Sequence, residues 1–509
     1  MSRRRKILIV AGVVFGVAIL IPVIRHYQLR FAVERYIAEL KAKGEPIELA
    51  QVIPPPVPPE QNGVPFITNA LANLKSENIV PGNPPPVMSM VARGKAMIGW
   101  QQPDIRDFDG VNKWEDLGRK LANARDDLAS FQSLTNHPVL DFNLDYQKGF
   151  DLQLPNLGSL KQAAQNLTAS AFYNLHQKNT AKACADVRVI LAIAKGETDE
   201  RILISQLVRF AIAAIGINPT WEILQSTNVS DDDLAQLQQG WQSLEFIAPI
   251  EQAMMFERVE NLQEFEQTRK SSEKFNKLWG YFYYAPETLV QENMMPRSML
   301  TPRSLFLRNW DEIQWRWFWS YQDELYGLKS YQIVIDATRA AETNKSFQVA
   351  QSFTSTKITQ LNQKRDSIDG LRGVFSVGAM NAALRKAVRI ETARNVVVAA
   401  IALKRYELRH HQLPATLDDL TPELLKAVPI DCMDGQPLRY RLKADGTFLL
   451  YSVGDNGVDD GGNPSPPKNI QSSNYYWQNN LVLDWVWPQP ATLEEIQKYY
   501  EEQGKKSGR

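Results

Sequence analysis

An acidic loop near the end of the chain carries the most specific chemical pattern in the sequence. Residues 449–462 read Leu-Leu-Tyr-Ser-Val-Gly-Asp-Asn-Gly-Val-Asp-Asp-Gly-Gly. An apolar run stops at a glycine, and acidic side chains then alternate with residues that accept tight turns, so several oxygens can converge on one point. Oxygen ligands on a flexible loop suit a hard cation such as Ca²⁺. The alternative is a solvated turn that holds no ion.

A short hairpin must position this loop. Two β-runs, 438–442 and 447–452, are joined by Lys443-Ala444-Asp445-Gly446, which is a hairpin signal. A long helical pattern over 384–406 precedes them. The sequence therefore predicts a small C-terminal α+β unit that ends in the acidic loop.

Several segments of this unit occur together in one order: Ala-Leu-Lys-Arg-Tyr at 402–406, Leu-Pro at 413–414, Val-Pro-Ile-Asp at 428–431, Gly-Gln-Pro-Leu-Arg-Tyr at 435–440, and Tyr-Ser-Val-Gly-Asp-Asn-Gly at 451–457. In this combination the unit resembles the globular domain of the type II secretion major pseudopilin. The resemblance implies a structural Ca²⁺ site in the loop, closed by a later aspartate that precedes a tryptophan. Its implied ligands are Asp455, Asp459, Asp460 and Asp484.

The N-terminus departs from that family. It offers no peptidase site before a phenylalanine, and some hundreds of residues separate it from the C-terminal unit. Assembly as an ordinary pilus subunit is therefore not expected, and the unit reads as a module reused on another scaffold.

The N-terminal apolar run predicts the location of the protein. Residues 7–24 carry no charge and are long enough to cross a bilayer, and the basic residues Arg3, Arg4, Arg5 and Lys6 precede them. A cleaved signal peptide is the alternative, but no small-x-small cleavage site follows. We therefore expect a single inner-membrane helix, with residues 1–6 cytoplasmic and the bulk of the chain periplasmic or extracellular.

The remaining sequence predicts a mainly α protein in several parts. Residues 25–61 read as a stalk and a proline-rich spacer, whose run at 54–59 would lift the folded part away from the bilayer. Residues 62–372 read as a helical-hairpin body, 373–490 as the pseudopilin-like α+β domain, and 491–509 as a charged tail. Residues 342–372 are polar and read as a surface helix or a linker.

Apolar spacing predicts a helical hairpin in the middle of the body. One stripe comprises Leu160, Ala164, Leu167, Ala171 and Leu175, and after a polar turn the next comprises Ala183, Val187, Ile190 and Ala194. The pair resembles one tetratricopeptide unit, although the tryptophan and the Leu-Gly pair of that repeat are missing. Residues 202–224 follow as an apolar helix; polar residues interrupt it and Pro219 ends it, which favours a buried core helix over a membrane span.

Aromatic residues are dense over 279–284 and 310–326. Consecutive aromatics on a helix cannot all face one core. One interpretation is that these aromatic residues form a thick core between helices. The other is that some of them line a groove, contact a partner or lie at the membrane interface.

The charge balance disfavours one class of function. Lys plus Arg and Asp plus Glu both total 57, so the formal net charge is zero and nucleic-acid binding is disfavoured. The two cysteines, Cys184 and Cys432, do not make a disulfide framework, and two buried thiols are expected.

No complete catalytic motif appears. We expect a non-catalytic binding or assembly role in the bacterial cell envelope, with a protein partner and a possible relation to secretion. The alternative is an envelope hydrolase that uses carboxylates of the body, such as Glu251 or Glu257.

Overall fold

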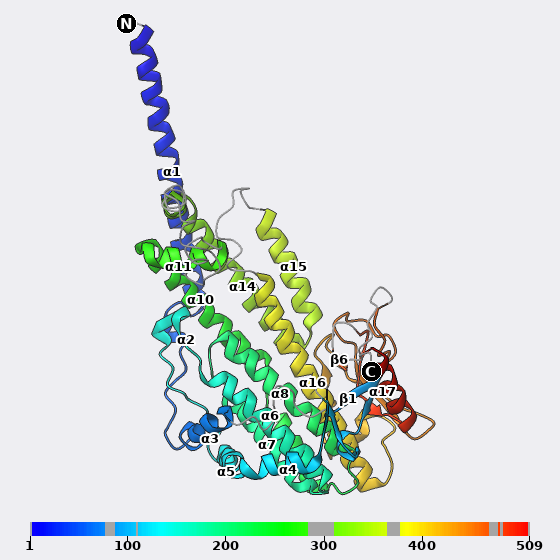
Figure 1. Cartoon of the computed structure of the whole chain (residues 1–509). Coiled ribbons are helices and arrows are strands. Elements are labelled where there is room, and N and C mark those ends of the chain that lie inside the picture. Colours follow the sequence, from blue (N-terminus) through cyan, green and yellow to red (C-terminus); the bar gives the residue numbers. More distant parts are fainter. Residues whose placement is uncertain are drawn as a thin grey trace.

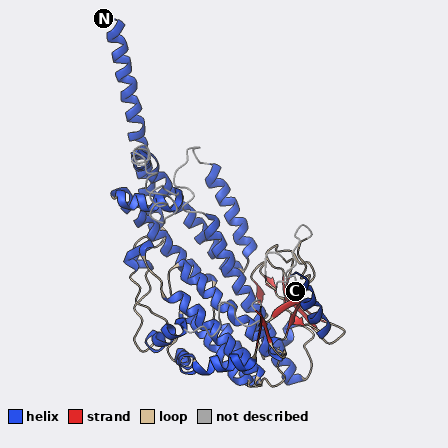
Figure 2. Cartoon of the chain, viewed as in Figure 1, coloured by secondary structure: helices blue, strands red, loops and turns tan. Residues whose placement is uncertain are grey.

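The computed structural model describes residues 3–76, 87–107, 110–283, 310–363, 377–467, 477–478 and 482–506. Helices hold 67% of these described residues and strands 7%, so the predicted mainly α class is confirmed (Figure 2). One long helix projects from a helical body, and the strands gather beside the C-terminal helix (Figure 1).

The helices are α1 (Arg3–Ala42), α2 (Leu49–Val52), α3 (Val64–Ser76), α4 (Trp114–Asn123), α5 (Arg125–Ser130), α6 (Asn156–His176), α7 (Thr180–Gly196), α8 (Leu203–Leu224), α9 (Asp231–Gln242), α10 (Ile247–Lys270), α11 (Ser272–Tyr283), α14 (Ser320–Asn344), α15 (Phe347–Gln363), α16 (Val377–His410) and α17 (Leu493–Lys506). Short turns are η1 (Gly99–Gln101), η2 (Phe131–Thr135), η3 (Tyr146–Asp151) and η6 (Leu417–Leu420), and η5 (Trp315–Trp319) is a π-helix.

The part of the chain expected to form a stalk packs against the body. Helix α1 runs without a break from Arg3 to Ala42, and its C-terminal half packs against η5 and α14, where Val33 and Leu40 are buried. The proline run that follows is fixed at both flanks: Pro46 O accepts from Arg258, and Asn62 Nδ2 donates to Asp141 O. Both flanks of the run are therefore fixed to the body, and its role as a spacer from the bilayer stays a prediction. The prolines stiffen a connection whose two ends the body already holds.

An ionic network holds the end of α1. Glu45, which follows α1, accepts from Arg258 Nη2 of α10 at 3.1 Å and also from Arg339 of α14. Arg339 Nε in turn donates to Glu251 Oε1 at 2.7 Å. Arg258 is fully buried and Glu45 nearly so, at 0% and 8% exposure. Although burial acts to raise it, hydrogen bonds from Arg339 and the charge of Arg258 hold the pKa of Glu45 below its usual value.

The predicted hairpin of the body is confirmed. Helices α6 and α7 pack against each other, and both stripes of small and apolar residues that the sequence indicated are buried. Ala164, Ala171 and Ala183 are each 0% exposed, which permits a close approach of the two helices. Asn179 caps the start of α7 by accepting a hydrogen bond from the backbone N–H of Lys182.

Helix α8 lies in the core, as predicted. It is long and apolar enough to cross a membrane, yet 56% of its apolar window is buried in the protein. Its Arg209 is fully buried and donates to the backbone oxygens of Ala194 and Glu245. The expectation that Pro219 ends the helix is wrong, because α8 continues to Leu224. Thr220 Oγ1 donates to Gly216 O at 2.7 Å in that turn, which supplies a local hydrogen bond beside the proline.

The polar stretch after residue 342 contains the turn between two packed helices. Helix α14 ends at Asn344, Lys345 takes the left-handed conformation with φ 50°, and α15 begins at Phe347. Residues 364–376 lie outside the described part of the chain.

The strands form four small sheets: β1 (Ser89–Ala92), β2 (Lys95–Met97) and β10 (Gln489–Pro490); β3 (Ile105–Asp107) and β4 (Gly110–Asn112); β5 (Ile430–Asp431) and β6 (Gln436–Pro437); and β7 (Arg439–Leu442), β8 (Phe448–Ser452) and β9 (Trp485–Val486). The predicted hairpin is β7 with β8, paired from Arg439–Tyr451 to Leu442–Phe448.

The C-terminal unit is joined to the body rather than separate from it. Helix α16 packs against α8, α9, α10 and α14, and β10 pairs in parallel with β2 from the other end of the chain. One hydrophobic cluster extends from Val52 to Trp487. The expected charged tail includes the ordered helix α17, whose Ile496 packs on Val91 and Met97. Helix α17 is amphipathic, and its Glu495 also pairs with Lys95 of β2 at 2.6 Å.

Both cysteines are free and buried. Burial raises the pKa of each thiol to about 12.

Replacing Glu45 by glutamine tests the network. The variant Glu45→Gln leaves the buried Arg258 without its counter-charge, so we expect the free energy of unfolding to fall by about 3–5 kcal/mol. Urea unfolding of the detergent-solubilised full chain, followed by tryptophan fluorescence, measures this change.

Glu34→Gln is the matched control. Glu34 pairs with Arg30 one turn away on α1, and both side chains are 50% exposed, so the loss should stay within about 0.5 kcal/mol. Equal losses for the two variants would contradict the role given to Glu45.

Candidate functional site

The acidic loop leaves β8 through glycines that no other residue replaces easily. Gly454 has φ 64°, and a Cβ there would lie 2.9 Å from Leu483 O. Gly457 has φ 65° and lies against the side chain of Gln348, which donates to Gly457 O. These positive φ angles turn the loop back toward the segment before β9.

The structure brings Asp484 to the loop, as the resemblance implied. Asp484 is fully buried. Its Oδ2 accepts from the backbone N–H groups of Gly462 and Asn463, both at 2.9 Å, and its Oδ1 accepts from that of Asp460 at 3.4 Å. Burial raises the pKa of Asp484, and these three N–H donors act in the opposite direction. The carboxylate therefore closes the loop through hydrogen bonds to its backbone.

The other three predicted ligands have separate partners. Asp455 forms a two-pronged ion pair with Arg389 of α16, with Nε to Oδ1 at 2.9 Å. Asp459 accepts from the hydroxyl of Tyr451 at 2.9 Å and lies 3.5 Å from Arg439 Nε. Asp460 accepts from Asn456 Nδ2 at 2.8 Å.

A second buried aspartate organises the base of the loop. Asp431 of β5 is 0% exposed and accepts from Ser452 Oγ at 2.9 Å and from the backbone N–H of Val453 at 2.8 Å. Arg439 of β7 lies 3.2 Å from Asp431 Oδ2 and also pairs with Asp434. Burial raises the pKa of Asp431 to about 6, against these donors. The sequence had offered Asp431 only as part of the Val-Pro-Ile-Asp segment of the resemblance.

As these residues lie, they do not fit a Ca²⁺ ion. The oxygens of Asp455 and Asp459 face guanidinium groups and those of Asp484 face N–H groups, whereas a calcium ion needs several oxygens turned toward one point. No cluster of three or more His, Cys, Asp or Glu side chains suited to a metal occurs within the described residues. Calcium binding by another arrangement of the loop stays a prediction.

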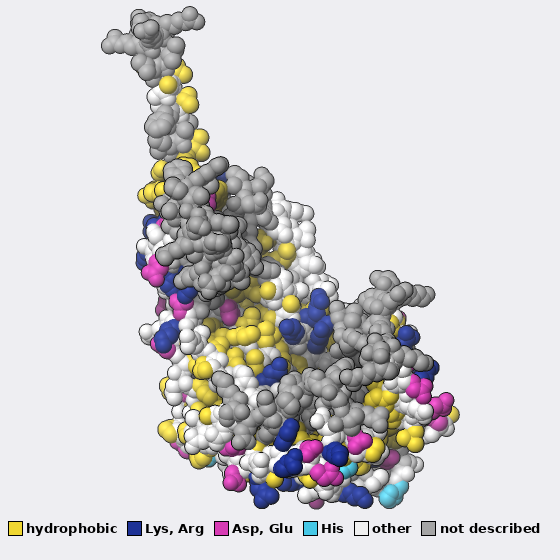
Figure 3. All heavy atoms as spheres, in the orientation of Figure 1, with side chains coloured by type: hydrophobic (Ala, Val, Ile, Leu, Met, Phe, Trp, Pro, Cys, Tyr) yellow, Lys and Arg dark blue, Asp and Glu magenta, His cyan; other side chains and the backbone are white. Residues whose placement is uncertain are grey.

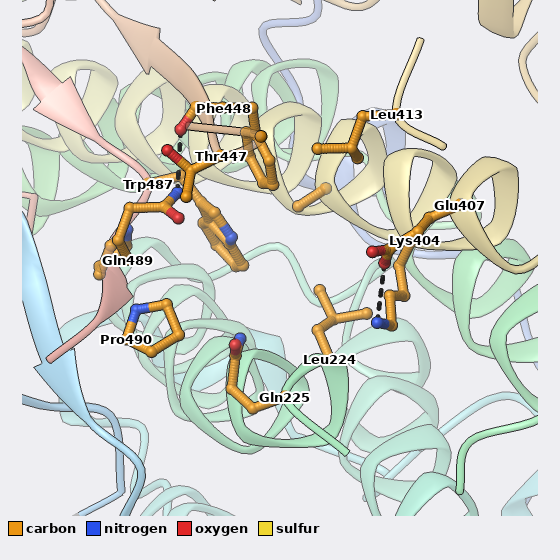
Figure 4. A pocket seen from close by; sticks show the side chains of 13 residues that line it. Leu224, Gln225, Lys404, Glu407, Leu413, Thr447, Phe448, Trp487, Gln489 and Pro490 are labelled. Carbon is orange, nitrogen blue, oxygen red and sulfur yellow. Dashed lines mark hydrogen bonds and ion pairs between the residues drawn. The ribbon is translucent and has the colours of Figure 1, made fainter. Parts of the chain in front are cut away.

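A pocket of about 280 Å³ lies where the helical body meets the C-terminal unit (Figure 4). The end of α8, the C-terminal third of α16, the start of β8 and the segment 487–490 line it. Trp221 Nε1 of α8 donates to Pro488 O at 2.8 Å, which fixes that segment to the body.

The pocket combines an apolar wall with a charged edge. Leu224, Phe448 and Trp487 contribute apolar surface. Lys404 and Glu407 of α16 form an ion pair at 2.8 Å, which lies on the side of Leu224 and away from Trp487 in Figure 4. Among the described residues that line it, Thr447 carries the one hydroxyl, and none is Cys, His or Ser. This arrangement suits binding of an apolar group with a polar neighbour better than nucleophilic catalysis.

The two carboxylates proposed for a hydrolase serve other contacts. Glu251 pairs with Arg339 in the network of Glu45, and Glu257 accepts from the backbone N–H of Leu203 at 3.4 Å. Burial raises the pKa of Glu257 to about 7.

A second cavity of about 200 Å³ lies between η3 and the ends of α10 and α11. Glu260 and Asp151 both line it. Burial and the charges of Glu257 and Glu264 raise the pKa of Glu260 to about 7, while Lys277 lowers that of Asp151. Opposite pKa shifts in two carboxyl groups that line one cavity also occur in acid and base pairs, but here Asp151 is paired with Lys274 and Lys277. The hydrolase alternative stays a prediction.

Asp484→Asn tests how the loop is held. An amide in place of the carboxylate turns N–H groups toward the loop's own N–H groups, so we expect the free energy of unfolding to fall by about 1–3 kcal/mol. Because the donors are backbone groups, the loss should be the same in Ca²⁺ and in a chelator, as measured by chemical denaturation.

The control is Asp460→Asn, which changes an exposed carboxylate and should alter stability by less than about 0.5 kcal/mol. If chelation destabilised the unaltered chain as much as Asp484→Asn does, an ion and not the backbone would hold the loop.

Comparison of the chain with family models, with curated proteins and with solved structures finds no match.

Proposed function

We propose that this chain is a single-pass membrane protein of the bacterial cell envelope whose body, outside the cytoplasm, binds a protein partner and catalyses no reaction. One observation carries the proposal. Helix α1 is a continuous helix that is apolar and projecting in its N-terminal half and bonded to the body in its C-terminal half.

The exposed half of α1 supports the membrane anchor. At 1.5 Å per residue, the run 7–24 spans about 27 Å, close to the thickness of the hydrocarbon core. Its described side chains project outward, and seven of them are more than half exposed: Ile9, Val10, Val13, Val14, Leu20, Ile21 and Ile24. Figure 3 shows hydrophobic side chains along this projecting helix. A continuous apolar surface of this kind is stable in lipid and unstable in water.

The basic cluster sets the proposed orientation. Arg3, Arg4, Arg5 and Lys6 precede the apolar run, and an excess of basic residues favours the cytoplasmic side. The body, which begins at the other end of the run, is then periplasmic or extracellular.

The pocket between α8, α16 and β8 supports a binding role. It offers an apolar wall for one side chain of a partner and the Lys404–Glu407 pair for a polar neighbour. The resemblance to the pseudopilin domain is the reason to propose a partner from secretion machinery, and that relation, like the calcium site, remains a proposal.

Single cysteines test orientation and pocket occupancy together. In Leu493→Cys the new thiol replaces a side chain that is 82% exposed, so a membrane-impermeant maleimide should label it in spheroplasts as fast as in the purified full chain. In Gln225→Cys the thiol lies in the pocket, so a bound partner should slow its labelling in spheroplasts relative to the purified protein. Mass spectrometry of the labelled chain measures both rates.

The unaltered chain is the control, because its two buried thiols should remain unlabelled. Labelling of Leu493→Cys only after lysis would overturn the orientation. Equal rates for Gln225→Cys in spheroplasts and in solution would overturn the partner.

A further inference from the structure

Two sets of exposed apolar side chains lie near the point where α1 meets the body. Tyr27 and Phe31 follow Ile24 on α1, and the three are 49%, 64% and 51% exposed, respectively. Trp310, Ile313 and Trp317, in residues 310–314 and η5, are each 50% exposed. We call these six residues the collar.

The collar is distinct from the aromatic core beside it. Trp315 is fully buried, stacks near Phe265 and Phe275, and donates from Nε1 to Asp323 Oδ2 at 3.0 Å. Some aromatic side chains of residues 310–326 are therefore buried in the core, and others are exposed on the surface. Half-exposed tryptophans need an explanation, because burial of such a side chain is strongly favourable.

Trp317 of the second set is fixed to α1. His26 Nδ1 lies 3.0 Å from Trp317 O, and its ring lies 5.0 Å from that of Trp317 and 5.1 Å from that of Tyr321. Arg25 Nη2 donates to Gln322 Oε1 at 3.1 Å. Trp317 thus contacts α1 at His26, which lies two residues after Ile24, the last residue of the apolar run.

This level corresponds to the surface of the bilayer that α1 is proposed to cross. Two residues of helix advance about 3 Å along the axis, so Trp317 lies at the boundary between hydrocarbon and headgroups. Tryptophan and tyrosine concentrate at that boundary because their rings are apolar and their N–H or O–H groups are polar. Basic side chains also suit it, and Arg25, Arg30 and Arg316 lie among the collar residues in sequence.

We propose that the collar is inserted in the headgroup region of the outer face of the same membrane, as a lipid contact in addition to the membrane-spanning part of α1. The exposed apolar surface of α1 continues from the proposed span through Ile24, Tyr27 and Phe31 without a break in helical spacing, and this continuity favours lipid over a protein partner. The inference rests on the proposed membrane anchor.

Spin labels at three positions of the full chain test it in lipid nanodiscs. Ile313→Cys reports the collar, Val14→Cys reports the proposed span, and Leu493→Cys reports a water-exposed surface; the native thiols are too buried to react. Accessibility to oxygen and to a soluble nickel chelate is measured for each label. We expect oxygen to reach the label at 14 best and the chelate to reach the label at 493 best, with the label at 313 between them on both scales.

Trp310→Cys repeats the collar measurement at a second exposed position and should give the same result. If the labels at 313 and 310 are as open to the chelate as that at 493 while the label at 14 is in lipid, the collar is wrong and the anchor stands. If collar labels are closed to both reagents, protein covers this surface and the lipid contact is wrong. A label at 14 that is open to the chelate overturns the anchor, and the collar with it.

Discussion

The buried pairing of Glu45 with Arg258 and Arg339 is the interaction on which the arrangement of this protein depends. Arg258 of α10 and Arg339 of α14 converge on one carboxylate that follows the end of α1. A guanidinium taken out of water is stable only when its partners are in place, and Arg258 also donates to Pro46 O and Gln332 Oε1. The network therefore favours one relative position of α1, α10 and α14, and disfavours a detached α1.

Because α1 is attached to the body, the proposed membrane anchor would also fix the orientation of the body. A flexible tether would leave the body free to turn, whereas a continuous helix with a bonded end sets how the body faces the bilayer. The pocket at the junction with the C-terminal unit is built on the same rigid body, because α16 and α8 line it and both pack against α10. The anchor, the body and the proposed binding surface are thus connected through packed helices.

Local patterns in the sequence predicted local structure well. The β7–β8 hairpin and the two stripes of α6 and α7 follow from spacing and turn residues, and the burial of α8 follows from the polar residues that interrupt it. The proximity of Asp484 to the acidic loop was implied only by the resemblance to the pseudopilin domain. What spacing cannot indicate is which distant group will meet a given side chain. Arg389 and Asp455 are 66 residues apart, and β2 and β10 come from nearly opposite ends of the chain. The ion pairs that occupy the predicted calcium ligands, and the joining of the C-terminal unit to the body, arise from such contacts. The attachment of the predicted stalk to the body was missed for the same reason, because nothing near Glu45 in the sequence points to Arg258.

Hydrogen exchange of the full chain in nanodiscs tests rigid attachment most directly. Peptides covering 33–45 should exchange as slowly as peptides from the buried part of α10, and Glu45→Gln should remove that protection while leaving α10 more protected than 33–45. Fast exchange of residues 33–45 in the unaltered chain, at the rate of an exposed helix, would show that α1 is a free stalk and would contradict the fixed orientation.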